Sequence, residues 1–144
     1  MSGARGGYVI DASVAVKWVV PEAGTTQALA LRRHALYAPD LLIAECANIL
    51  WKKQQRGELT AREASMAARL RERAELDLMP MRRLLDRATA LAVALDHPPY
   101  DCIYLACAEV VRRPFVTADT RLLCKLAGGA AVSIEVAALA AMPA

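Results

Sequence analysis

Aromatic residues are few in this sequence, and long uncharged apolar runs are missing. Phe, Trp and Tyr make up 5% of the 144 residues, so we expect a core built mainly from Ala, Leu and Val. No segment approaches the roughly 20 apolar residues that a membrane-spanning helix needs. The opening MSGARGG also lacks the basic stretch and apolar run of a secretory signal. The sequence therefore predicts a cytoplasmic protein with no membrane partner.

Cysteine and histidine are also sparse, with four and two residues respectively. In a cytoplasmic protein the cysteines are expected to be reduced. None of them forms a Cys-x-x-Cys pair, and His34 and His97 stand at no ligand-like spacing from them. This pattern disfavours a zinc site. It predicts instead that the cysteines are small apolar side chains on helix faces, namely Cys46, Cys102, Cys107 and Cys124.

The bulk composition is that of a folded domain. Hydrophobic residues make up 56% of the chain and charged residues 23%, so folding can bury enough apolar surface to offset the loss of chain entropy. With 144 residues and no repeat or linker-like segment, we expect one domain over residues 1–144. The net charge of +3 is compatible with a polyanionic partner, but it is weak evidence for one.

Short β-rich segments alternate with longer helical ones. Strands are expected at 8–10, 36–38, 76–81, 115–117 and 131–134. Helices are expected at 12–19, 23–33, 41–56, 60–75, 82–95, 100–111 and 119–127. Asp40 can cap the third helix, and Thr60 with Glu63 forms a capping box at the start of the fourth. The alternation predicts an α/β fold, a three-layer α/β/α sandwich with a mainly parallel central sheet.

Two aspartates follow predicted strands at the edge where such sheets carry their sites. Asp11 comes directly after the first strand, and Asp119 lies just beyond the strand that ends near Thr117. Ligands of open α/β sheets bind beyond the carboxyl ends of the strands. An ordinary structural interpretation also exists, because both residues precede helices that Asp commonly caps. Asp101, in the first turn of its helix, has the same alternative explanation.

Glu45 is harder to explain as a structural residue. It lies within LLIAECANILW, a helix that is apolar around nearly its whole circumference and is therefore expected to be buried. A buried carboxylate needs a partner. Asp101 raises a similar question, because seven uncharged residues follow it before Glu109.

Carboxylates gathered at one site repel each other, and a divalent cation can offset that repulsion. Oxygen ligands without a positioned His or Cys select Mg²⁺, with Mn²⁺ as a possible substitute. Such a site suits phosphoryl chemistry, because the cation polarises the phosphate and activates a water.

Four sequence blocks resemble, in order, the signature blocks of PIN-domain nucleases. They are Asp11-Ala12-Ser13, Glu45-Cys46-Ala47-Asn48, the segment YDCIYLA from Tyr100, and the segment TADTRL from Thr117. The resemblance runs from about Tyr8 to Ile134. Within the family, the chain looks most like the VapC toxins of bacterial type II toxin–antitoxin systems.

The resemblance implies that Asp11, Glu45, Asp101 and Asp119 bind the metal and carry catalysis. It implies a Mg²⁺-dependent endoribonuclease that leaves a 5′-phosphate and a 3′-hydroxyl, with RNA as the substrate. Ser13 and Thr117 match positions whose hydroxyls support the site, where they would orient a carboxylate or a water. Asn48, one turn after Glu45, could act likewise.

The resemblance also implies two protein partners. The first is a cognate antitoxin, which we expect in a groove near Trp51 and the helix over 60–75. The second is another copy of the chain in a homodimer, as the Ala- and Leu-rich helices carry more apolar surface than one core uses.

Two other classes remain as alternatives. An aspartate-nucleophile phosphatase or a phospho-acceptor receiver also has acids at strand ends. The phosphatase usually needs Asp-x-Asp, however, where this chain has Ser13, and the receiver needs a late lysine that the strand ending at Thr117 does not offer. A non-catalytic module, whose acids bind a structural metal or a partner's arginine, is compatible with the same residues.

Overall fold

The computed structural model describes residues 6–72, 75–127 and 132–144, and it contains a five-stranded sheet. Every neighbouring pair of strands is parallel, in the order β3-β2-β1-β4-β5. The predicted parallel α/β architecture is therefore confirmed. The strands are β1 (Tyr8–Ile10), β2 (Leu36–Pro39), β3 (Asp77–Met79), β4 (Phe115–Thr117) and β5 (Val136–Ala138).

Helices connect the strands, as parallel pairing requires. Some predicted helices are divided, with a short 3-10 turn at one end. The helices are α1 (Ala12–Ala15), α2 (Thr25–Leu31), α3 (Leu41–Gln55), α4 (Ala61–Glu72), α5 (Leu85–Leu95), α6 (Pro99–Val111) and α7 (Thr120–Ala127). The 3-10 turns are η2 (Val16–Trp18), η3 (Met81–Leu84) and η4 (Leu139–Ala141). In the described parts of the chain, no helix has the length and apolar character needed to cross a bilayer.

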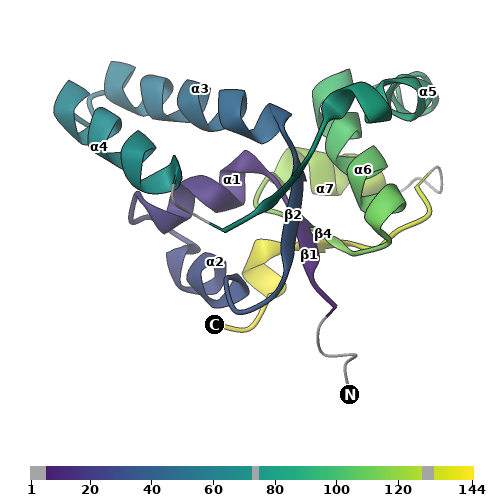
Figure 1. The fold of residues 1–144 in the computed structure, drawn as a ribbon, viewed down its shortest axis with the longest axis horizontal. Helices are drawn as coiled ribbons and strands as arrows, with labels where there is room; N and C mark the ends of the chain where they lie inside the picture. Colours follow the sequence, from purple (N-terminus) through teal and green to yellow (C-terminus); the bar gives the residue numbers. More distant parts are fainter. Residues whose placement is uncertain (1–5, 73–74, 128–131) are drawn as a thin grey trace.

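The order of the strands determines where a site can form. The chain passes from β1 to β2 and β3 on one side, and then crosses to β4 and β5 on the other. In Figure 1, α1 and α2 lie on one side of the strands and α5 and α6 on the other, which gives three layers. The direction of winding changes between β1 and β4, and such a switch point opens a crevice at the carboxyl ends of the two strands.

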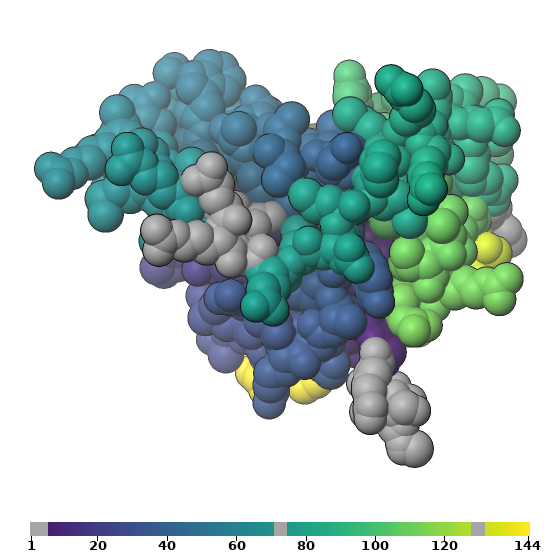
Figure 2. Space-filling view, in the orientation of Figure 1, coloured from purple at the N-terminus to yellow at the C-terminus, as the bar shows by residue number. Residues whose placement is uncertain are grey.

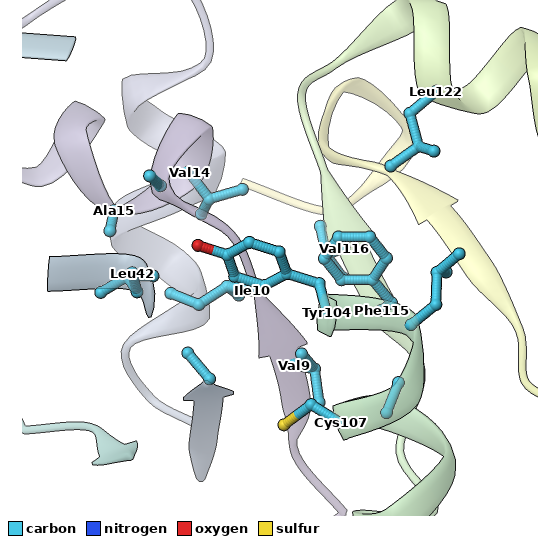
Figure 3. Close-up of a cluster of buried hydrophobic side chains, with 14 of the residues drawn as sticks. Val9, Ile10, Val14, Ala15, Leu42, Tyr104, Cys107, Phe115, Val116 and Leu122 are labelled. Atoms are coloured by element: carbon cyan, nitrogen blue, oxygen red, sulfur yellow. The ribbon is translucent and has the colours of Figure 1, made fainter. Parts of the chain in front are cut away.

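The core lies on both faces of β1 and β4. Val9, Ile10, Phe115 and Val116 have no exposed surface, and Tyr104 of α6 is equally buried beside them (Figure 3). Three of the four cysteines are buried on α3 and α6, as predicted for small apolar side chains, and Cys124 is exposed. The core therefore holds β1 and β4 in place, and with them the residues that directly follow each strand.

The last strand lies later in the chain than predicted. Residues 132–134 are not a strand, residue 131 is outside the described residues, and β5 begins at Val136. Register is the reason, because Val136 pairs with Phe115 and Ala138 with Thr117. Val132 and Ile134 instead line a hollow beside α7. Their β-branched side chains are partly buried outside the sheet, which propensity alone does not distinguish from a strand.

The prediction that α3 is buried on all sides is wrong. Leu42, Cys46 and Leu50 are buried, but Ile43 and Trp51 are each 56% exposed. Helix α3 packs on α4, and Figure 2 shows this pair extending from one side of the molecule. The apolar residues all around α3 therefore include a face that no other part of the described chain covers.

The N-caps predicted for α3 and α4 have different outcomes. The Thr60 hydroxyl accepts the Glu63 N–H at 3.0 Å, and the Glu63 carboxylate accepts the Thr60 N–H at 2.8 Å, so the capping box is confirmed. The Asp40 side chain does not cap α3. Its Oδ1 accepts the N–H of Met81 at 3.0 Å instead, which ties the end of β2 to the turn after β3. The predicted end of α4 near residue 75 adjoins residues 73–74, which are not described.

Candidate active site

Asp11 is the centre of a hydrogen-bond network at the switch point. It follows β1, it is 6% exposed, and it caps α1 by accepting the Val14 N–H at 3.3 Å. The Ser13 hydroxyl donates to Oδ1 and the Thr117 hydroxyl donates to Oδ2, each at 2.5 Å. Both oxygens of Asp11 are therefore oriented by side chains that were expected to support the site.

The same two hydroxyls tie β1 to the turn after β4. Ser13 Oγ accepts the Ala118 N–H at 3.1 Å, and Thr117 Oγ1 accepts the Asp119 N–H at 3.0 Å. Each hydroxyl therefore accepts one backbone N–H and donates its single proton to a carboxylate oxygen of Asp11. Asp119 is thereby held next to Asp11 through its backbone.

Burial determines the electrostatics of Asp11. Loss of hydration raises its pKa from 3.8 to about 6, against the opposing effect of the hydrogen bonds it accepts. The charge of Asp101 raises the pKa of Asp11 further. Burial is also the main cause that raises the pKa of Glu45, and Asp101 again adds to the effect. Asp11, Glu45 and Asp101 therefore share one electrostatic environment, although they come from three different helices or their caps.

Glu45 and Asp101 each have one oxygen held by a neighbour. The Tyr104 hydroxyl donates to Glu45 Oε1 at 2.6 Å. His97 Nε2 lies 2.6 Å from Asp101 Oδ2, and the side chains of His97 and Asp101 are 16% and 29% exposed. Burial and the charges of Glu45 and Asp11 raise the pKa of Tyr104, so its hydroxyl keeps its proton and remains a donor.

Asp119 is less closely associated with the other three acids. Its Oδ1 accepts the N–H groups of Arg121 and Leu122 at 2.9 and 3.3 Å, so its carboxylate caps α7. Asn48 is exposed on α3, and its side chain hydrogen-bonds to none of the described residues. The role expected for Asn48 therefore stays a prediction.

The carboxylate oxygens of these acids are suitable ligands for a hard cation. Within the described ranges, Glu45 Oε2, Asp101 Oδ1 and Asp119 Oδ2 accept no hydrogen bond, and no Lys or Arg pairs with any of the four acids. Carboxylate oxygens of this kind are the ligands that Mg²⁺ and Mn²⁺ prefer. The described residues contain no group of three or more acidic, His or Cys side chains already arranged to hold a metal. Binding would therefore have to draw the carboxylates closer together.

Sequence reasoning missed Tyr104 and His97. Tyr104 lies three residues after Asp101, on the same side of α6, but it stands within the uncharged run that follows Asp101. His97 precedes Asp101 by four residues, a spacing at which side chains meet on a helix. His97 stands at no ligand-like spacing from the cysteines, and the two prolines that follow it place it outside α6. In both cases the spacing of three or four residues from Asp101 is the feature of the sequence that indicates a position near this acid.

Comparison with known proteins agrees with this geometry. Residues 8–129 match the family model described as PIN domain. Ribonuclease VapC3 of Pyrobaculum aerophilum is 36% identical over 79% of this chain and 90% of its own length. Ribonuclease VapC9 of Mycobacterium tuberculosis is 32% identical over 79% of this chain and 87% of its own length.

A solved structure shows the same fold. The crystal structure of PAE2754 from Pyrobaculum aerophilum superposes with a TM-score of 0.63 and covers 92% of this chain and 84% of that one. Its sequence identity is 24%, so this likeness concerns the fold. The residues 8–129 that match the PIN-domain family model include all four acids, Asp11, Glu45, Asp101 and Asp119.

Proposed function

Since this chain belongs to the PIN-domain family and is VapC-like within it, we propose that it is a Mg²⁺-dependent endoribonuclease. In this proposal it acts as the toxin of a toxin–antitoxin pair. One observation carries the enzymatic part: three carboxylates with no Lys or Arg partner among the described residues are coupled at the switch point, where burial raises the pKa of Asp11 to about 6.

The residues would divide the work as follows. Asp11, Glu45, Asp101 and Asp119 would hold Mg²⁺, or Mn²⁺ in its place. When bound, the cation supplies charge that polarises the scissile phosphate and activates a water. Ser13 and Thr117 would keep both oxygens of Asp11 directed into the site, because their hydroxyl protons have no other acceptor in the network.

The test is RNA cleavage by the purified chain with Mg²⁺, with EDTA, and with Mn²⁺ added back. We expect cleavage only when a divalent metal is present. Asp101→Asn should abolish it, because Asn keeps the shape but removes an anionic ligand. Asp86→Asn is the matched control, since Asp86 is an exposed acid in the first turn of α5. Cleavage that survives EDTA, or an active Asp101→Asn variant, would contradict the proposal.

We propose that the antitoxin binds in the cleft between α3 and α4. This cleft has a volume of about 450 Å³, and Ile43, Ala47 and Leu50 of α3 face Ala68 and Arg69 of α4 across it. Its apolar lining suits the apolar face of a partner helix. Trp51 is exposed on the same helix α3, so it remains a candidate contact at the rim. The relatives named VapC support a partner of this kind.

A further inference from the structure

Glu45 depends on a single hydrogen bond for its position. Within the described parts of the chain, its carboxylate accepts a hydrogen bond only from the Tyr104 hydroxyl, at 2.6 Å. Asp11 differs, because Ser13, Val14 and Thr117 all donate to it. The two acids lie in the same electrostatic environment, but only Asp11 is held from several directions.

A glutamate held in this way has reasons to leave the site. Its side chain is longer than that of aspartate, so holding it in one conformation costs more rotamer entropy. The charge of Asp101 also acts on Glu45 unfavourably. Glu45 is only half-buried, so solvent is within reach of its carboxylate. Without the contact to Tyr104, both effects favour rotation of the carboxylate away from the other acids.

Tyr104 is well placed to prevent that rotation. It has no exposed surface, and its ring stacks on Phe115 with centroids 5.8 Å apart and planes inclined by 11°. Figure 3 shows its hydroxyl oxygen pointing away from Phe115, on the side of Val14 and Ala15 of α1. A ring buried between α6 and the sheet has little freedom to move. The position of the hydroxyl is therefore determined by the core of the sheet.

We propose that Tyr104 is a positioning residue that holds Glu45 through Oε1 and leaves Oε2 available to the divalent metal. This inference rests on the proposed metal-dependent function. Tyr104 reduces the number of conformations that Glu45 loses when the metal binds, and such preorganisation raises affinity. It also limits the rearrangement by which Glu45 joins the other three acids.

The first experiment measures metal affinity in Tyr104→Phe, which removes the hydroxyl and keeps the ring on Phe115. Mn²⁺ titration followed by water-proton relaxation reports binding without RNA. We expect the dissociation constant to rise roughly 10- to 100-fold, the range typical for residues that orient metal ligands. The Mn²⁺ concentration for half-maximal RNA cleavage should rise by a similar factor, with kcat largely recovered at saturating metal. Tyr37→Phe in β2 is the matched control, with wild-type affinity expected.

A double-mutant cycle separates positioning from a general structural role. Glu45→Ala removes both the ligand and the acceptor of the Tyr104 hydroxyl. If Tyr104 acts through Glu45, adding Tyr104→Phe to Glu45→Ala leaves the Mn²⁺ dissociation constant unchanged. A further loss of affinity in that background, as large as in the wild type, would overturn the proposal.

Glu45→Asp tests the pair from the other side and applies even if Tyr104→Phe does not fold. It keeps the carboxylate but shortens the side chain beyond reach of the Tyr104 hydroxyl, so a similar loss of Mn²⁺ affinity is expected. Wild-type affinity in Glu45→Asp or in folded Tyr104→Phe would overturn the positioning role and leave the proposed function intact. A wild-type protein that binds no Mn²⁺ and cleaves no RNA would overturn both.

Discussion

At the scale of the residue, the same acid can cap a helix and also serve as a ligand. Asp11 caps α1 and Asp119 caps α7, as the structural interpretation expected. Helix N-termini begin where strands end in this fold, so a capping acid also stands at the edge where a ligand binds. In Asp119 one oxygen caps while the other accepts no hydrogen bond from the described residues. A cap is therefore no argument against a ligand role.

Asp11 should make the metal-free protein less stable as the pH rises. Its pKa is about 6 in the folded protein against an ordinary value of 3.8, so between these values the folded state binds more protons than the unfolded state. Stability then falls as the pH rises through this window. Asp11→Asn removes the ionisation, so its melting temperature relative to wild type should increase from pH 4 to pH 7 in EDTA. The upper limit is on the order of 3 kcal/mol, at about 1.4 kcal/mol for each pKa unit.

The comparison between the variants decides this prediction. Asp86→Asn, at an exposed acid, should show no such change with pH. A constant difference between Asp11→Asn and wild type from pH 4 to pH 7 would mean that Asp11 titrates alike in both states.

At the scale of the element, the capping box should stabilise α4 measurably. The reciprocal bonds between Thr60 and Glu63 satisfy two N–H groups at the helix start. Thr60→Ala should lower the free energy of unfolding by about 1 kcal/mol, the typical cost of losing such a cap. Urea denaturation measures it, with Thr89→Ala as the control, because exposed Thr89 bonds back to the Leu85 carbonyl within α5. Equal stability of Thr60→Ala and wild type would refute a stabilising cap.

The cleft between α3 and α4 should be separable from the catalytic edge. Ala68→Glu places a charge in the apolar lining, and an unpaired charge is costly to bury under a partner helix. We expect antitoxin affinity to fall at least tenfold, measured by calorimetry, while RNA cleavage by the free protein stays unchanged. Ala61→Glu, exposed on the same helix, should bind as wild type. Wild-type affinity in Ala68→Glu would place the antitoxin elsewhere.

At the scale of the whole molecule, uncovered apolar side chains favour self-association. In the described ranges, the exposed large apolar residues include Trp51, Leu85, Val93 and Tyr100, with exposed fractions of 56% to 79%. A folded domain that exposes several large apolar side chains can bury them against a second copy. We predict a homodimer, so light scattering at tens of micromolar should give a mass of about 31 kDa, twice the 15.5 kDa of the chain. A mass of one chain at that concentration would contradict the prediction.

The sequence by itself determined the parallel α/β architecture and the placement of Asp11 and Asp119 at the carboxyl ends of strands. The alternation of short strands and helices predicted a parallel sheet, and the positions of Asp11 and Asp119 after strands placed them at one edge. These inferences succeed because they depend on neighbours along the chain: periodicity, caps and the direction of parallel strands. The capping box of α4 belongs to the same class.

Only the tertiary structure decided which side chains meet and which face remains open. Tyr104 reaches Glu45 across 59 positions of the chain, and Thr117 reaches Asp11 across 106. The apolar run around Glu45 predicted burial on all sides, yet α3 is covered on one face only. An apolar sequence shows that burying a surface is favourable. Whether the same chain or a partner buries it depends on how the helices and strands pack.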